Sequence, residues 1–269
     1  MTGRNRINSA GIFILIGLIA VTFAGLPGNA APRKAPDPVS EGMIAAIIDG
    51  DTVILENGSE VRLVGIQAPK LPLGRRGFKP WPLADQAKQF LTALTKGKSA
   101  TLRYGGTKID RHRRLLAHLF LEDGHWVQQE VLKAGMARVY SFPDNRSRVD
   151  ELLAAEQRAR RAKKGIWAHP YYRIRSPENL KRDLGSFQVI EGSPKNVAIV
   201  RGRAYFNFGD NWRKDFTITI SPRDARRFWR DKDIVAMYGK ERLRVRGWLK
   251  EFNGPQIEAT HPEQIEVLK

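Results

Sequence analysis

The chain has 269 residues, no cysteine and a formal net charge of +18 at pH 7. This length suits one or two domains, each able to bury an ordinary core. The absence of cysteine excludes disulfides, thiolate metal sites and thiol nucleophiles. The positive charge favours a polyanion as partner, namely nucleic acid, anionic lipid or wall polymer; a solvated basic surface without a specific partner is the alternative.

Residues 1–30 are predicted to be a signal peptide. Two arginines precede a mostly apolar segment, and small residues near position 30 suit a cleavage site. The apolar run of about 17 residues is at the lower limit for a membrane span, so an uncleaved anchor through residues 10–27 is the alternative. The sequence therefore predicts a periplasmic or secreted protein, or one anchored to the membrane. Residues 31–42 are expected to form a flexible leader.

The next segments have strand and helix patterns in alternation. Residues 43–55 alternate and then run apolar, as a strand does, and residues 61–66 return after the turn Asn57-Gly58. Further strands are predicted at residues 99–104, 115–121 and 125–127, and helices at 83–94, 126–134 and 148–164, the last two stopped by Gly135 and Gly165. Five short strands and three helices predict a small closed barrel with helices packed outside.

A second β-domain is predicted at residues 185–269, after a basic linker at 169–184. Its strands are expected at residues 187–191, 198–208, 216–220, 243–251 and 256–259, with one helix at 222–230. Five strands with a helix between the third and fourth indicate an OB-like barrel. An unrelated small β-domain with the same number of elements is the alternative.

Four motifs occur in order in the first domain. They are Asp49-Gly50-Asp51-Thr52-Val53, then Arg62-Leu63-Val64-Gly65-Ile66-Gln67-Ala68-Pro69, then Asp110-Arg111-His112-Arg113-Arg114-Leu115-Leu116-Ala117, and a closing pair made by residues 134–139 and 164–167. With the elements between them, residues 43–168 resemble the staphylococcal-nuclease-like (thermonuclease) family. The resemblance implies a mainly β fold with α (α+β): an OB barrel with three helices, followed here by the second small OB-like domain.

The resemblance also implies a calcium-assisted phosphodiesterase site. In the family, two acids and a backbone carbonyl hold Ca²⁺ beside the scissile phosphate, a glutamate activates water, and two arginines brace the phosphate oxygens. Asp51 matches one metal acid, Ala68 the carbonyl, and Arg62 and Arg114 the two arginines. Arginine forks that grip phosphate supply the electrostatic stabilisation on which such reactions depend. Ca²⁺ is the implied cofactor, with Mg²⁺ or Mn²⁺ as alternatives.

Two positions depart from the family pattern. Gln67 stands where the second metal acid belongs, so its oxygen could ligate only without charge, and the metal site should be weak. Lys70 stands where the glutamate base belongs, and a protonated lysine cannot take a proton from water, although it could add positive charge at the phosphate. Asp49 lies two residues from Asp51 and could assist the metal through a water.

Residues outside the catalytic motifs are predicted to contact nucleic acid. Tyr140 and Phe142 match family positions near the bound base and could stack on it, with packing at the barrel edge as the alternative. Bases in the second arginine loop and at the end of the third helix are expected to follow the phosphate backbone: Arg111, Arg113, Arg160, Arg161, Lys163 and Lys164.

The sequence thus predicts an exported, metal-assisted nuclease that hydrolyses phosphodiester bonds of DNA or RNA, weakened by Gln67 and Lys70. A catalytically impaired nucleic-acid-binding protein on a nuclease fold is the alternative. An envelope protein that binds lipid or wall polymer is a third hypothesis, in which case the N-terminal segment is the membrane contact. The sequence indicates no protein partner.

Overall fold

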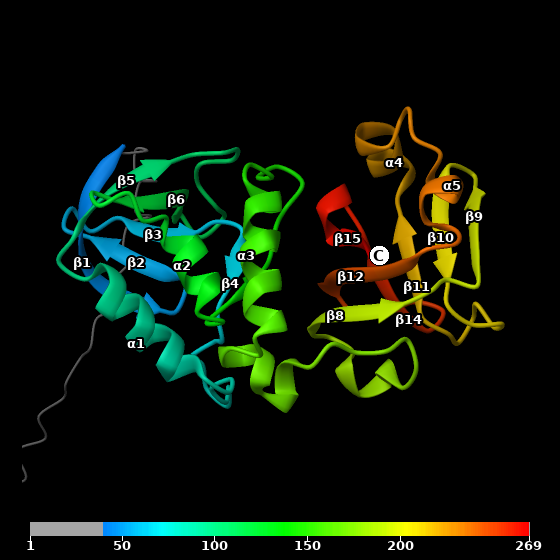
Figure 1. Ribbon diagram of the computed structural model, residues 1–269, viewed down its shortest axis with the longest axis horizontal. Coiled ribbons are helices and arrows are strands. Elements are labelled where there is room, and N and C mark those ends of the chain that lie inside the picture. The colour runs from blue at the N-terminus through cyan, green and yellow to red at the C-terminus, as the bar shows by residue number, and fades with distance from the viewer. Residues whose placement is uncertain (1–39, 269) are drawn as a thin grey trace, which may run out of the picture. The chain divides into compact units, whose positions relative to one another are not determined.

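The computed structural model describes residues 40–268, which belong to one compact unit (Figure 1). The predicted signal peptide or anchor and nearly all of the predicted leader lie outside the described residues. Within residues 40–268, no helix has the length and apolar character needed to cross a membrane. The boundaries predicted for the two β-domains remain predictions.

The first β-domain is built on the predicted closed barrel. Its strands close in the order β1 (Glu41–Asp49), β2 (Thr52–Leu55), β3 (Glu60–Leu63), β6 (Leu115–Leu121) and β5 (Ser99–Arg103). Strands β3 and β6 are parallel, and the other neighbours are antiparallel. Ile44, Val53, Leu63 and Leu119 are completely buried in its core. Full burial of each such side chain contributes about 1.5–3 kcal/mol, so the barrel is a stable base for the site.

Three helices accompany the barrel: α1 (Ala84–Thr95), α2 (Val127–Lys133) and α3 (Val149–Arg161). The strand predicted at residues 125–127 is reduced to one antiparallel bridge between Trp126 and Phe120, because Val127 already begins α2. The predicted stop of the third helix at Gly165 is also wrong, since the backbone leaves the helix earlier and Lys163 is left-handed at φ 49°. Gly165 instead permits close backbone contact: a Cβ there would lie 2.2 Å from the carbonyl oxygen of Gly135.

Two glycines break predicted strands and thereby shape the site. The strand expected at 43–55 divides at Gly50, where an added Cβ would lie 2.7 Å from the Cβ atoms of both Ala68 and Ala87. The strand expected at 61–66 divides at Gly65, whose φ of 82° suits glycine. After Gly65, the chain forms the two-residue strand β4 (Ile66–Gln67), which pairs with β7 (Arg138–Val139). The site residues lie just beyond these breaks.

The second β-domain forms two sheets. One has the order β13 (Lys250–Glu251), β14 (Pro255–Glu258), β11 (Thr217–Ile220), β10 (Arg203–Asn207), β9 (Asn196–Val200), and the other β15 (Ile265–Leu268), β12 (Arg242–Trp248), β8 (Phe187–Gly192). Between β11 and β12 the chain forms two helices, α4 (Pro222–Phe228) and α5 (Ile234–Tyr238), where the sequence predicted a single helix at 222–230. This order is consistent with the OB-like expectation, although the strands form two sheets instead of one closed barrel. The strand predicted at 198–208 divides because Arg201 and Gly202 both have positive φ.

Ordered contacts connect the two β-domains. The predicted linker contains the 3-10 segments η2 (Pro170–Tyr172) and η3 (Leu180–Asp183), and the Tyr172 hydroxyl donates to the carbonyl of Pro82 at 2.7 Å. Arg246 of β12 is 1% exposed and pairs with Glu156 of α3 at 2.9 Å and with Glu266 of β15. Burial alone would lower the pKa of Arg246, but the two glutamates raise it, so this guanidinium is a fixed charge at the junction.

Candidate active site and nucleic-acid interface

The site is centred on the turn between β1 and β2. Asp51 is completely buried there, and its own N–H donates to Asp49 Oδ1 at 3.1 Å, which orders the turn. Its carboxylate accepts from the N–H of Ala68 at 2.7 Å and from the hydroxyl of Thr52 at 3.3 Å. The predicted contribution of Ala68 was its carbonyl oxygen as a ligand, whereas the bond in the structure is from its N–H to Asp51.

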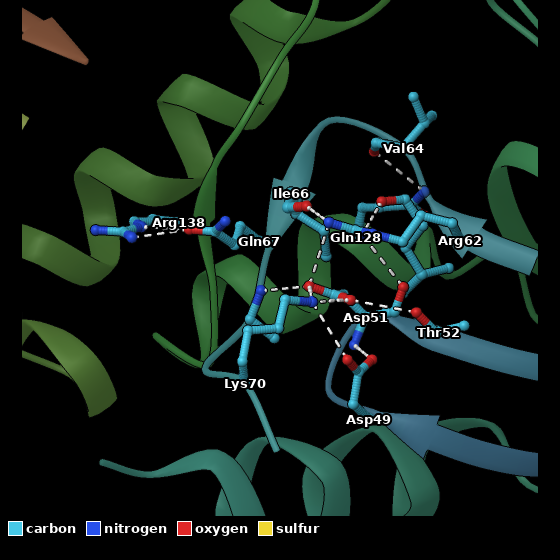
Figure 2. A network of polar contacts seen from close by, with 12 residues as sticks. Asp49, Asp51, Thr52, Arg62, Val64, Ile66, Gln67, Lys70, Gln128 and Arg138 are labelled. Atoms are coloured by element: carbon cyan, nitrogen blue, oxygen red, sulfur yellow. Dashed lines mark hydrogen bonds and ion pairs between the residues drawn. The ribbon is translucent and has the colours of Figure 1, made fainter. Parts of the chain in front are cut away.

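Lys70 extends into the space between the two acids (Figure 2). Its Nζ lies 2.7 Å from both carboxylate oxygens of Asp51 and 3.2 Å from Oδ2 of Asp49. An ammonium has three donors and no acceptor, and these three contacts use that capacity. Lys70 therefore holds, with a single positive charge, the position between two carboxylates in which the sequence predicted a metal ion.

Arg62 lies on the other side of Asp51 and is almost buried. Its Nη1 donates to the carbonyls of Asp51 at 3.2 Å and Leu63 at 2.7 Å. Its Nη2 donates to the carbonyl of Ile66 at 2.6 Å and lies 3.3 Å from Asp51 Oδ2. The guanidinium thus joins the ends of β2, β3 and β4, and much of its donor capacity is used within the fold.

The charges around the turn shift the pKa values of Asp49 and Asp51 in opposite directions. Burial alone would raise the pKa of Asp51, but the charges of Arg62 and Lys70 and the Lys70 hydrogen bond hold that pKa well below its ordinary value. Burial raises the pKa of Asp49, and the neighbouring Asp51 carboxylate raises it further, against the opposing charge of Lys70. Asp51 is consequently a firmly ionised partner for Lys70, while Asp49 accepts a proton more readily than an exposed aspartate.

Gln67 points away from the acids (Figure 2). Its Oε1 accepts from Nε of Arg138 at 3.0 Å and from Nη2 at 2.8 Å, across the β4–β7 pair. Burial lowers the pKa of Arg138 to about 10, and its guanidinium lies 4.5 Å from the ring centre of Phe187. The predicted use of Gln67 as a metal ligand has no support in this geometry. Sequence reasoning missed Arg138, because no local pattern shows that residues 71 positions apart pair across two short strands.

The residues present do not fit the calcium ion that the family resemblance implies. Ca²⁺ takes six to eight oxygen ligands at short distance. Here Asp51 and Asp49 are hydrogen-bonded to Lys70, and Gln67 is held by Arg138. Among residues 40–268, no cluster of three or more His, Asp or Glu side chains is arranged to hold a metal ion. A cation at this place would first have to displace an ammonium that contacts both acids.

A pocket of about 620 Å³ lies beside this closed group of charges. It is lined by both predicted arginines, Arg62 and Arg114, and by both predicted aromatic residues, Tyr140 and Phe142. The Arg114 side chain is 27% exposed, and its Nε and Nη2 donate to Asp110 Oδ2 at 2.9 and 2.7 Å. Phe142 is 47% exposed, so its ring face is available to a ligand. The structure therefore brings together the predicted phosphate and base contacts.

The remaining predicted bases lie in two places. Arg111 lines the same pocket, and Arg113 is exposed next to it in a left-handed conformation at φ 66°. Exposed bases also gather at the end of α3 and just past it, namely Arg161, Lys163 and Lys164. Arg160 differs from them, because its Nη1 pairs with Glu156 at 2.8 Å beside Arg246. Arg160 therefore forms a structural ion pair instead of the nucleic-acid contact that the sequence predicted.

The closed barrel carries arginines and aromatic rings around one pocket, which are the side chains that OB folds use to contact nucleic acid. A family model described as "Staphylococcal nuclease homologue" matches residues 60–169. Endonuclease YncB of Bacillus subtilis is 32% identical over 155 residues, covering 54% of this chain and 72% of that protein. This chain therefore belongs to the staphylococcal nuclease homologue family.

Two further relatives show how far the similarity extends. Endonuclease YhcR of Bacillus subtilis is 30% identical over 165 residues, which cover 54% of this chain but only 14% of that protein. An uncharacterized endonuclease of Escherichia coli is 29% identical over 131 residues, covering 47% of this chain and 76% of that protein. At the level of the family, these relatives support a nuclease with nucleic acid as its substrate.

Proposed function

We propose that this chain binds nucleic acid on a staphylococcal nuclease fold in which Lys70 has replaced the catalytic metal ion. The observation that supports this proposal is the position of the Lys70 ammonium, 2.7 Å from both carboxylate oxygens of Asp51. It favours the catalytically impaired alternative over metal-assisted hydrolysis. The endonuclease relatives support nuclease activity for the family, and hydrolysis by this particular chain is the point to be tested.

Binding does not need the metal. Arg62 and Arg114 line a pocket that also contains the exposed ring of Phe142. Contacts between such cations and phosphates supply most of the affinity of non-specific nucleic-acid binding, and stacking on an aromatic ring adds to it. Because Lys70 is a covalent part of the chain, its charge is present at every calcium concentration. Affinity should therefore depend on salt but not on chelators.

Two requirements of hydrolysis, a general base and a strong positive charge beside the phosphate, are poorly met by the side chains of this site. Lys70 stands at the position of the general base, and its ammonium, which donates to Asp49 and Asp51, cannot accept a proton from water. An ammonium also supplies one positive charge where a calcium ion supplies two. Phosphoryl transfer relies mainly on positioning and charge, and removal of one stabilising group often costs about 10²–10³ in rate.

The deciding experiment uses the full chain with labelled single- and double-stranded DNA and RNA. Cleavage is followed with Ca²⁺, Mg²⁺, Mn²⁺ or EDTA, and binding is followed by fluorescence anisotropy under the same conditions. We expect binding that is equal in calcium and EDTA, without metal-dependent cleavage. Metal-dependent cleavage that Asp51→Ala abolishes would overturn the proposal, and so would the absence of binding to every nucleic acid.

The Arg114→Ala variant tests the pocket itself. Loss of one charge-assisted phosphate contact should lower affinity about tenfold and reduce the salt slope by about one. Arg226→Ala is the matched control, because Arg226 is exposed on α4 and does not line the pocket. Equal losses in the two variants would indicate general charge attraction and would contradict a specific role of the pocket.

Export is a further proposal, based on the predicted signal at residues 1–30. An exported chain would meet extracellular or periplasmic nucleic acid. Expression of the full chain with a C-terminal epitope, followed by fractionation and N-terminal sequencing, tests this. Intact protein in the cytoplasm would contradict it, and intact protein in the membrane fraction would favour the anchor.

A further inference from the structure

The second β-domain presents an exposed aromatic pocket that the proposed function does not use. A pocket of about 350 Å³ lies on the sheet formed by β9, β10, β11 and β14. Tyr205 contributes from β10, Trp212 from the loop between β10 and β11, and Phe252 from the turn between β13 and β14. Trp212 is 50% exposed and Phe252 is 65% exposed. Large rings this open to solvent are costly to leave without a partner.

The strand register explains which aromatic residues reach this pocket. Successive side chains of a strand point to opposite faces, so Tyr205 and Asn207 share the pocket face while Phe206 points into the core. Phe206 is accordingly 0% exposed, and Tyr205 lines the pocket. Asn207 pairs in register with Thr217, which pairs with Gln256 on the next strand. All three line the pocket, so amide and hydroxyl groups lie beside the rings.

The charges around the pocket favour an anion. The Arg213 guanidinium lies 4.6 Å from the ring centre of Trp212. Lys250 is the cross-strand partner of Gln256, and such partners project to the same face. Within residues 40–268, neither Arg213 nor Lys250 forms an ion pair, whereas Glu258, the acid on this face, is neutralised by Arg203 at 3.2 Å. Two cations without an ion-pair partner among the described residues therefore border rings and amides.

We propose that this pocket binds unstacked bases of single-stranded nucleic acid, with Trp212 and Phe252 as stacking surfaces and Arg213 and Lys250 near the phosphates. A single strand offers free base faces to aromatic rings, whereas a duplex keeps its bases stacked inside. A pocket of about 350 Å³ is of the size that holds small planar groups and cannot admit a duplex. The cations favour nucleic acid over a neutral oligosaccharide, which could also stack on the rings.

The proposal rests on the proposed function only for the class of ligand. The pocket is lined by a different set of residues from the one that contains Arg114 and Phe142. The two sites can therefore be tested separately with variants of each.

The test measures affinity of the full chain for a labelled oligothymidylate and for a matched duplex by fluorescence anisotropy at two salt concentrations. Trp212→Ala and Phe252→Ala should each weaken single-strand binding on the order of tenfold, the usual effect of losing one base–aromatic stack, and leave duplex binding unchanged. Ile199→Ala is the control, because Ile199 is 53% exposed on β9 of the same sheet but does not line the pocket. It should change neither affinity.

Each other outcome has a defined meaning. Unchanged single-strand affinity in both aromatic variants, or equal loss on single strand and duplex, overturns this inference. Trp212→Ala identifies the part of the tryptophan fluorescence that comes from Trp212. If a neutral oligosaccharide protects this part from quenching by acrylamide and oligothymidylate does not, the inference is overturned in favour of a sugar ligand. If Arg114→Ala lowers affinity and Trp212→Ala does not, the proposed function stands and this inference is overturned; the reverse result supports this pocket and removes only the Arg114 pocket from the proposed function. Circular dichroism of each variant verifies that the fold is retained.

Discussion

The two sides of the candidate site in the first β-domain differ in how their polar groups are satisfied. On the acid side, Asp49 and Asp51 are bonded to Lys70, and Gln67 is bonded to Arg138. On the pocket side, Arg114 remains partly exposed and Phe142 is 47% exposed, beside a cavity of about 620 Å³. One side is complete within the fold, and the other is open to a ligand.

This difference teaches that a nuclease fold can separate metal binding from nucleic-acid binding. A single lysine satisfies two buried carboxylates that would otherwise repel each other, so the turn no longer needs a cation. The pocket side does not depend on that cation for its shape, because Arg62 is held by the carbonyls of Asp51, Leu63 and Ile66. Four predictions follow from this contrast, in order of expected effect.

The largest effect is expected from Lys70→Ala, which opens the acid side. Asp51, completely buried in the fold, would keep only Arg62 as its ionic partner. Breaking a buried ion pair by removing one partner costs about 3–5 kcal/mol, and chemical denaturation should show a loss of this size. Lys98→Ala, at an exposed position near the start of β5, is the control and should change stability little. If Lys70→Ala loses no more stability than the control, the ion pairs of Lys70 with Asp49 and Asp51 do not stabilise the fold as predicted.

The second effect is a gain of calcium response in Lys70→Glu. This substitution replaces the ammonium by a third carboxylate beside Asp49 and Asp51, which is the beginning of a calcium site. Calcium at 100 times its Kd should then raise stability by about 2.7 kcal/mol, measured as a rise in Tm. Wild type and Lys70→Gln should show no such rise. A wild-type response equal to that of Lys70→Glu would mean that Lys70 does not block a cation.

The third effect compares two buried histidines, which stay neutral in the fold, with Asp51, which is buried as a charged group paired with Lys70. Burial lowers the pKa of His118 and of His261 from 6.5 to about 4. The unfolded chain therefore binds more protons between these values, so stability falls as the pH drops from 6.5 towards 4. The low pKa of Asp51 acts only below about pH 4, where the unfolded chain takes up a proton that the carboxylate paired with Lys70 in the fold still resists.

Thermal unfolding between pH 7 and 4 measures this dependence. His118→Gln combined with His261→Gln should flatten the curve relative to its own value at pH 7, whereas His125→Gln, on an exposed turn, should leave it unchanged. A wild-type Tm that does not fall over this range would show that the two imidazoles do not titrate as their burial requires.

The smallest effect is expected on the pocket side, from Phe142→Ala. Loss of one stacking ring should weaken single-strand binding about tenfold, or about 1.4 kcal/mol, without a change in stability. Tyr140→Phe is the control, because it keeps the ring and removes only the hydroxyl that accepts from Trp248 at 2.9 Å. If Phe142→Ala lowers Tm and leaves affinity unchanged, the ring belongs to the packing of the barrel edge.

Much of the first domain could be predicted from the sequence, because its signals are local. The turn at Asn57-Gly58, the alternation of apolar residues and the helical spacing led to the barrel and to all three helices. The errors lie where backbone contacts between distant segments decide, as at Gly165 against Gly135. In the second domain the bend at Arg201-Gly202 and the last strand, β15, were missed, because neither has a strong local pattern.

For the site, the sequence by itself determined which chemical groups are available: one metal acid in Asp51, two arginines, and a lysine and a glutamine where acids were expected. Only the tertiary structure decided how these groups pair. The fold brings Lys70 to Asp51 across 19 positions and Gln67 to Arg138 across 71. Buried charges must find partners, and the fold decides which backbone segments, and so which partners, come together. Composition and the spacing of residues along the chain do not reveal this proximity.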